Sequence, residues 1–79
     1  MDNSYAKATE VLKRNQVRIM RIRGVNGIGI GRGSDYGTEN KPCLVIYVEE
    51  GGDKRKIPKH IENIPVIITM SEGFTAKRE

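Results

Sequence analysis

The spacing of the apolar residues in this chain changes once, at Gly24. Before Gly24 these residues recur at the three- and four-residue intervals of a helix, and after it they alternate as in a strand. A chain of 79 residues with one such change has room for one helix and a few short strands. A large enclosed active site and a dinucleotide-binding domain are excluded by this length. We expect a single domain over residues 1–79, with residues 1–3 and 76–79 disordered.

A helix is predicted from Ser4 to Arg21, with Ser4 as its N-cap. Asn15 falls among the apolar side chains of this helix, which predicts a position at the rim or a local hydrogen bond. Gly24 is expected to end the helix as its C′ residue. On a helical wheel the apolar side chains share one arc of about 120°: Tyr5, Ala8, Val11, Leu12, Ile19 and Ile22.

Three strands are predicted after the helix. In the first, which begins at Val25, Ile28 and Ile30 face one side and glycines alternate with them on the other. The second, residues 43–49, is apolar on both faces, which is typical of a central strand. The third, residues 66–70, follows a proline-bracketed segment, residues 57–65, that is too short for more than a single helical turn.

These elements predict an α+β fold of two layers. One N-terminal amphipathic helix packs on a three-stranded, mostly antiparallel sheet, in the order α-β-β-turn-β. The first two strands are expected to form an antiparallel hairpin, whereas the direction of the third strand stays open. The expected core consists of aliphatic residues from all four elements: Val11, Leu12, Ile19, Ile28, Ile30, Leu44, Ile46, Val48, Val66 and Ile68.

Composition restricts the cellular setting and the redox chemistry. One cysteine excludes an internal disulfide, and a single histidine leaves no zinc-ligand cluster. The longest uncharged apolar run, Cys43 to Val48, is far shorter than the ~20 residues that span a bilayer. The chain opens on polar residues without a signal-peptide pattern. We expect a cytoplasmic protein with no membrane partner.

No pattern in the chain predicts catalysis, a metal site or a cofactor site. The alternating glycines after Gly24 lack the spacing of a phosphate-binding loop, and we interpret them as places of close backbone approach or as a bare surface for a partner. Cys43 is expected to be a buried or strand-edge thiol, and His60 an exposed or packing residue. Glu49 and Glu50 would point to opposite faces of a continuing strand, which does not suit a paired acid and base. We expect that the protein is not an enzyme.

Two stretches together carry a family resemblance. Residues 23–31 contain GVNGIGIG after a basic helix, and residues 43–49 read CLVIYVE. With Ile57-Pro58, Ile61 and Pro65-Val66 completing an IPxxIxxxPV pattern, about residues 8–75 resemble a group of small bacterial α+β proteins. A similar segment lies N-terminal in some bacterial proteins described as trypsin-like serine peptidases. The resemblance implies a fold and assigns no catalytic residue.

The order of elements also looks like part of the ferredoxin-like metal-carrier and small-ligand regulatory domains. The Cys-x-x-Cys of the metal carriers is absent, and no strand precedes the helix.

The net charge of the whole chain at pH 7 is +4, and its positive charge is concentrated in the first third. Four basic residues fall on the helix side opposite the apolar arc: Lys7, Arg14, Arg18 and Arg21. Such a side is a solvated surface, a contact for an acidic protein, or a contact for the phosphates of nucleic acid.

The sequence favours a small non-catalytic binding or regulatory module that acts through protein–protein contact or self-association. The alternatives are a nucleic-acid-binding protein that uses the basic side of the helix and an accessory or propeptide-like segment of a serine peptidase. One helix covers one face of a sheet, so we expect the other face to be open and two copies to join face to face or edge to edge, unless the tail around Phe74 covers that face. The residues expected on that association face are Gly27, Gly29, Gly31, Val45 and Tyr47.

Overall fold

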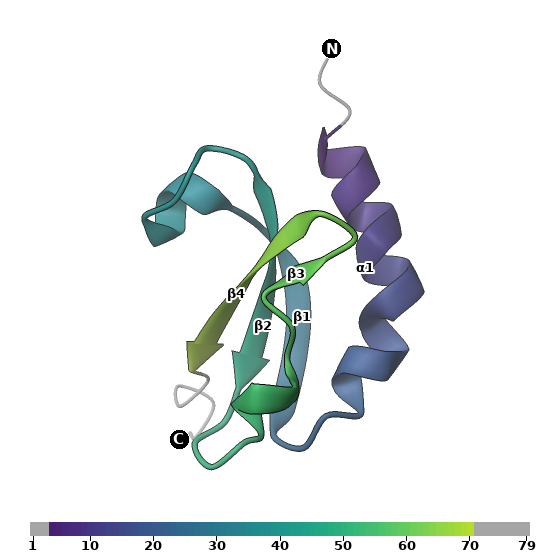
Figure 1. The fold of residues 1–79 in the computed structure, drawn as a ribbon, viewed down its shortest axis with the longest axis vertical. Helices are drawn as coiled ribbons and strands as arrows, with labels where there is room; N and C mark the ends of the chain where they lie inside the picture. The colour runs from purple at the N-terminus through teal and green to yellow at the C-terminus, as the bar shows by residue number, and fades with distance from the viewer. Residues whose placement is uncertain (1–3, 71–79) are drawn as a thin grey trace, which may run out of the picture.

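The structure is a computed structural model that describes residues 4–70. One helix, α1 (Ser4–Met20), packs against one face of a four-stranded sheet with the strand order β1-β2-β4-β3. Figure 1 shows α1 on one side of the sheet and the connection between β1 and β2 projecting on the other side. The two-layer α+β architecture predicted from the sequence is confirmed, whereas the predicted number of three strands is wrong, and the sheet is mixed, with one parallel pairing beside two antiparallel ones.

The helix follows the predicted apolar arc. Ala8, Val11 and Ile19 are buried against the sheet, while Tyr5 at the start of the arc is exposed. The helix ends at Met20, and Gly24 lies in the turn that follows, with φ +91°. The prediction of Gly24 as the C′ residue is therefore wrong: its left-handed backbone serves the turn into the first strand, four residues beyond the helix.

The predicted hairpin is confirmed. Strand β1 (Val25–Arg32) runs antiparallel to β2 (Pro42–Val48), with Ile28 opposite Ile46 and Ile30 opposite Leu44. These four side chains lie on the sheet face that α1 covers. A short 3₁₀ turn, η1 (Gly33–Tyr36), begins the connection between the two strands.

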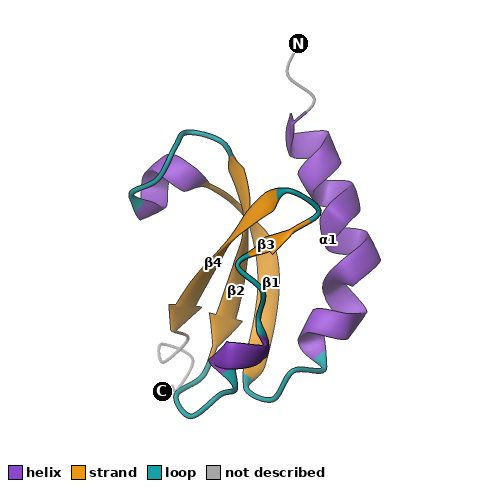
Figure 2. Cartoon of the chain, viewed as in Figure 1, coloured by secondary structure: helices purple, strands orange, loops and turns teal. Residues whose placement is uncertain are grey.

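Strand β4 (Ile64–Met70) settles the direction that the sequence left open. It runs parallel to β2, with Leu44 opposite Val66 and Ile46 opposite Ile68, so the sheet is mixed. Parallel pairing needs a connection that returns the chain to the starting end of β2. Residues 49–63 provide this return, through the 3₁₀ turn η2 (Lys54–Lys56) and the strand β3 (Figure 2).

Strand β3 (His60–Ile61) was not predicted. It pairs antiparallel with the start of β4 through a two-residue turn in which Glu62 (φ 50°) and Asn63 (φ 70°) are both left-handed. This is the backbone of a type I′ hairpin turn. The expectation that residues 57–65 are too short for more than a single helical turn agrees with the structure, which has no helix there; the segment instead forms half of a hairpin at the end of the sheet, where flanking prolines are tolerated.

The core lies between α1 and the covered sheet face. Leu44, Ile46 and Val48 of the predicted core are fully buried, as are Val11 and Ile19. Of the other predicted members, Leu12, Ile28, Ile30 and Val66 are half-buried. Ile68 is 39% exposed, and its prediction is wrong because α1 packs over β1 and β2 rather than over the far half of β4. Buried residues that were not predicted come mainly from around β3 and the turns: Val25, Ile57, Ile61 and Ile64.

No helix within residues 4–70 is long and apolar enough to cross a membrane.

Candidate functional site

The outer edge of β1 presents backbone groups that no neighbouring strand in residues 4–70 pairs with. β1 is the terminal strand of the sheet and pairs only with β2. The N–H of Gly33 donates to the carbonyl of Lys41 at 2.7 Å, which sets the alternation of hydrogen bonds along this antiparallel pair. Residues 27, 29 and 31 therefore direct their backbone groups to β2. Ile28, Ile30 and Arg32 direct theirs to the open edge.

The same alternation explains why Arg32 is opposite Pro42. Proline has no N–H, and in this register that position on β2 needs none toward β1. The edge itself contains no proline, so Ile28, Ile30 and Arg32 each offer both a donor and an acceptor. An edge of this kind is a template for another strand.

Glycine makes one side of this edge bare. A Cβ on Gly29 would have no atom within 4 Å, while one on Gly27 would meet only the Tyr47 ring at 3.7 Å. Gly31 is the exception, because a Cβ there would lie 2.7 Å from Val45 Cγ2 and 3.2 Å from the Tyr36 ring. The glycines are thus open in the middle of β1 and covered by a tyrosine at its end.

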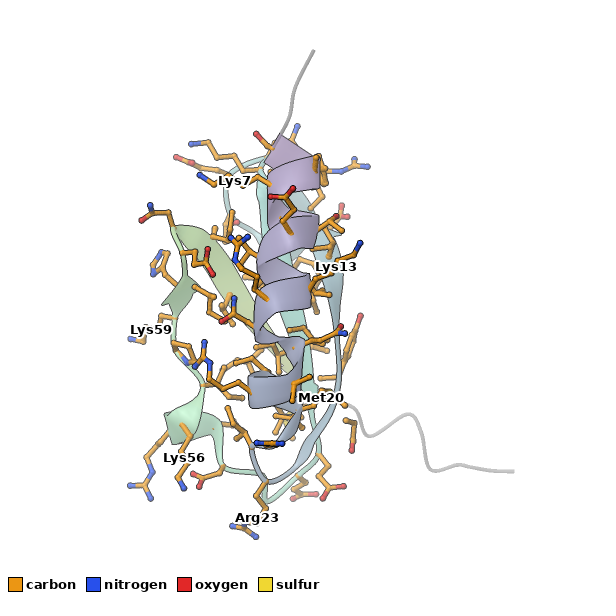
Figure 3. The ribbon with its side chains drawn as sticks, turned by 90° about the vertical axis from the view of Figure 1, so that its right-hand side faces the viewer. Lys7, Lys13, Met20, Arg23, Lys56 and Lys59 are labelled. Carbon is orange, nitrogen blue, oxygen red and sulfur yellow. The ribbon has the colours of Figure 1, made fainter. Side chains whose placement is uncertain are left out.

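The helix flanks the edge without covering it. Seen from the helix side, β1 runs to the right of α1, and Met20 and Lys13 point to that same side (Figure 3). The Met20 side chain is 43% exposed. At the other end of the strand, a cavity of about 570 Å³ is lined by Tyr5, Ile30 and Arg32 among others. Met20 therefore places accessible apolar surface beside one end of the edge, whereas the cavity at the other end, which Asp35 and Asn40 also line, is mainly polar.

The predicted association face is only partly open. Gly27 and Tyr47 are half-buried, but Val45 is 2% exposed, so the expectation that Val45 lacks cover is wrong. Tyr36 from η1 packs over Gly31 and accounts for part of this cover. Phe74, the alternative cover, lies outside the described residues. The accessible part of the predicted face is thus the strip of β1 around Gly29.

Three of the four predicted basic contact residues, Lys7, Arg14 and Arg18, lie on one side of α1, and Arg21 follows the last residue of the helix. Arg14 and Arg18 do not point freely into solvent, because both belong to a hydrogen-bonded cluster. Arg14 donates from Nε to Glu62 Oε2 at 3.2 Å and pairs with the same carboxylate through Nη2. Arg18 donates to Asn15 Oδ1 at 2.6 Å.

Asn15 holds this cluster together. Its amide donates to the Val11 carbonyl at 2.7 Å and to Glu62 Oε2 at 3.1 Å, which confirms the predicted local hydrogen bond. The Glu62 carboxylate thus joins α1 to the turn between β3 and β4. Neither the partner nor the turn could be inferred from the sequence, because Glu62 lies 48 residues from Arg14.

The cluster changes the protonation of its members. Hydrogen bonds from Arg14 and Asn15 hold the pKa of the Glu62 carboxyl below its ordinary value. The hydrogen bond to Glu62 raises the pKa of the Arg14 guanidinium. The pair therefore stays charged over a wide range of pH.

The turn between β3 and β4 and the η2 segment extend the basic side of α1. Figure 3 shows Lys7, Lys59 and Lys56 along the same border of the molecule, with Arg23 at its lower end. The N–H of Asp53 donates to the carbonyl of Arg23 at 2.9 Å, which fixes η2 beside the end of the helix. We call this surface the basic face, and its exposed members are Lys7, Arg14, Arg18, Arg21, Arg23, Lys54, Arg55, Lys56 and Lys59.

The residues considered for catalysis lie apart from one another. Cys43 is buried, as predicted, and burial raises the pKa of its thiol. His60 is exposed on β3, and Glu49 and Glu50 are exposed after β2 has ended at Val48. Within residues 4–70 no group of three or more potential metal ligands is brought together.

Comparison with protein-family models, with curated proteins and with solved structures found no match for the chain. The resemblance to the group of small bacterial α+β proteins stays a prediction.

Proposed function

We propose that the protein is a non-catalytic protein-binding module that self-associates through the outer edge of β1. The observation that carries this proposal is the run of outward backbone groups at Ile28, Ile30 and Arg32 beside a glycine side that offers no steric barrier. Main-chain hydrogen bonds to an added strand satisfy such groups. A second copy of the chain presents the same edge.

Two copies pair antiparallel about a two-fold axis. In the register centred on Gly29, Ile28 of one copy is opposite Ile30 of the second, and the two pairs exchange backbone hydrogen bonds. Gly29 then faces Gly29 of the second copy across a pair whose backbones lie close together. The four-stranded sheets join into one continuous sheet, with both helices on the same face.

Apolar surface beside the edge supports the same arrangement. Met20 points to the β1 side of the helix, and Val17, one helical turn earlier, is 61% exposed. A second helix placed on the same face would cover part of this surface. Removing apolar area from water contributes roughly 25 cal/mol per Å².

Sedimentation velocity between 1 and 500 µM tests the proposal with a matched pair of variants. Gly29→Lys adds a charge where a Cβ meets no atom, so the monomer should fold, but two lysines would oppose each other in the dimer. His60→Lys adds the same charge at an exposed position on β3, at the opposite end of the sheet from β1. We expect a dimer for the original chain and for His60→Lys, and a monomer for Gly29→Lys.

Three outcomes contradict the proposal. The first is a monomer at every concentration, and the second is a dimer that Gly29→Lys leaves intact. The third is a dimer that only Tyr47→Glu dissociates, which would assign the contact to the outer sheet face. The non-catalytic part predicts no cleavage of a peptide library, and reproducible turnover would overturn it.

A further inference from the structure

We propose that the basic face binds the phosphate backbone of a nucleic-acid duplex. The face lies on the border of the molecule opposite the β1 edge, as the positions of Lys59 and Lys13 on either side of α1 show (Figure 3). The two surfaces are separate, so this inference does not depend on self-association.

Charge is the first argument. The basic face has nine basic residues, and the acidic residues that contacts place beside its members or their chain neighbours are Glu10, Glu49, Asp53 and Glu62. Its net charge of +5 exceeds the +4 of the whole chain, so the rest of the chain is acidic on balance. Uneven charge of this kind concentrates a polyanion at one surface and repels it from the other.

The fold assembles this face from two distant parts of the sequence. Glu62 brings the turn after β3 to Arg14, and the Asp53–Arg23 backbone bond brings η2 to the end of the helix. The Glu62 carboxylate accepts hydrogen bonds from Arg14 and Asn15, and Oδ2 of Asp53 lies 3.7 Å from Lys56 Nζ. The carboxylates of Glu62 and Asp53 are thus each paired with a basic side chain, whereas Lys7, Arg55 and Lys59 are exposed.

The shape of the face favours a long polyanion over a small one. Its labelled members run from Lys7 near the start of α1 to Lys56 beyond its end, along the long axis of the molecule (Figure 3). The 17 residues of α1 alone cover about 25 Å. Duplex DNA carries one phosphate charge per ~1.7 Å of its axis, so several phosphates lie within reach.

The positions of the aromatic side chains favour a duplex over a single strand. Single strands are held by stacking of their bases on aromatic rings. Among residues 4–70, Tyr36 and Tyr47 lie on the sheet side away from the helix, and Tyr5 lines the cavity at the end of β1. The basic face therefore suits contacts to the phosphate backbone of the nucleic acid, which a duplex presents while its bases stay stacked.

Fluorescence anisotropy with a labelled 20-base-pair DNA duplex tests the inference. A face that contacts about five phosphates predicts a loss of affinity of roughly 500-fold between 50 and 200 mM NaCl. The variant Arg55→Gln/Lys59→Gln removes two charges along the face and should weaken binding about tenfold and lower the salt slope by about 2. The control Lys13→Gln/Arg32→Gln removes two charges elsewhere and should bind within about threefold of the original chain.

Every other outcome overturns the inference. Equal weakening by the two double variants would mean that DNA is attracted to the net charge of the protein rather than to the basic face. No binding at 50 mM NaCl, or tighter binding to a single strand of the same length, would contradict the duplex assignment. Binding to anionic lipid vesicles that exceeds binding to DNA would assign the face to a membrane surface. Circular dichroism on each variant checks that the fold is retained, as expected for exposed positions.

Discussion

Gly24 and Gly52 lie in backbone contact at the lower end of the sheet. A Cβ on Gly24 would be 2.3 Å from the Gly52 Cα, and a Cβ on Gly52 would be 3.1 Å from the Gly24 Cα. The Gly24 carbonyl accepts a hydrogen bond from the N–H of Glu49 at 2.8 Å across the same contact. Two loops separated by 28 residues are thus packed without side chains between them. This contact keeps η2 beside the end of α1, where its basic residues join the basic face.

Substitution of Gly24 by alanine should destabilise the fold severely. The added methyl group meets backbone that cannot rotate away, and φ +91° disfavours any side chain. We expect a loss of about 2–4 kcal/mol in the free energy of unfolding, measured by urea denaturation.

Two other glycines separate the effect of the close backbone contact on stability from the effect of positive φ. Gly51→Ala changes a residue with φ +88° and open space, so it should lose only about 1 kcal/mol. Gly29→Ala has open space without positive φ and should be neutral or stabilising by up to about 1 kcal/mol. Equal losses at Gly24 and Gly51 would contradict the close contact.

The turn between β3 and β4 should depend on the residue at position 63. Asn63 adopts φ 70°, which asparagine and glycine tolerate and β-branched residues do not. Asn63→Gly should therefore change the free energy of unfolding by less than about 0.5 kcal/mol, and Asn63→Val should lower it by about 1–2 kcal/mol. Thermal unfolding of the two variants compares them directly, and a tolerated valine would contradict the left-handed turn.

Acid should weaken the link between α1 and this turn. The pKa of Glu62 is lowered in the folded protein, so its contribution is present above the ordinary carboxyl pKa of 4.5 and is lost as the pH falls through the folded value. Glu62→Gln should destabilise the protein at pH 7 and make little difference at pH 3. Urea denaturation at both values measures this.

A control for that titration is Glu39→Gln. The ion pair of Glu39 with Lys41 is exposed on both sides, and such pairs contribute little. If Glu62→Gln lowers the free energy of unfolding by the same amount at pH 3 as at pH 7, the charge of Glu62 is not what stabilises the turn.

Two isoleucines opposite each other in the sheet should respond differently to truncation. Ile46 is fully buried under α1, and Ile46→Ala should lower the free energy of unfolding by about 2–5 kcal/mol. Ile68, opposite Ile46 on β4, is exposed, and Ile68→Ala should lose less than about 1 kcal/mol. Similar losses at the two positions would mean that α1 reaches across β4.

The spacing of the apolar residues predicted which side chains of the helix and of the first two strands are buried. The helical arc placed Val11 and Ile19 in the core, and alternation placed Leu44 and Ile46 on the covered face. The direction of β4 could not be predicted, because it depends on where the connection of residues 49–63 runs. Strand β3 is too short to show a period, and its turn uses Glu62, a residue that is rarely left-handed.

The candidate surfaces were predictable to different degrees. Lys7 and Arg18 share a helix side, which the wheel shows. Lys56 and Lys59 join them in one basic face only because of the β3 hairpin and the Gly24–Gly52 contact. Both features bring together residues that are far apart in the chain. The direction of each backbone group on β1 requires the register against β2.

The most direct test of the proposed self-association is amide hydrogen exchange along β1 at two concentrations, followed residue by residue by NMR. The amides of Gly29 and Gly31 point to β2 and should be protected at 5 µM and at 500 µM alike. The amides of Ile28 and Ile30 point to the open edge and should exchange freely at 5 µM and become protected at 500 µM. Ile28 and Ile30 amides that exchange at the same rate at both concentrations would contradict pairing of two chains through this edge.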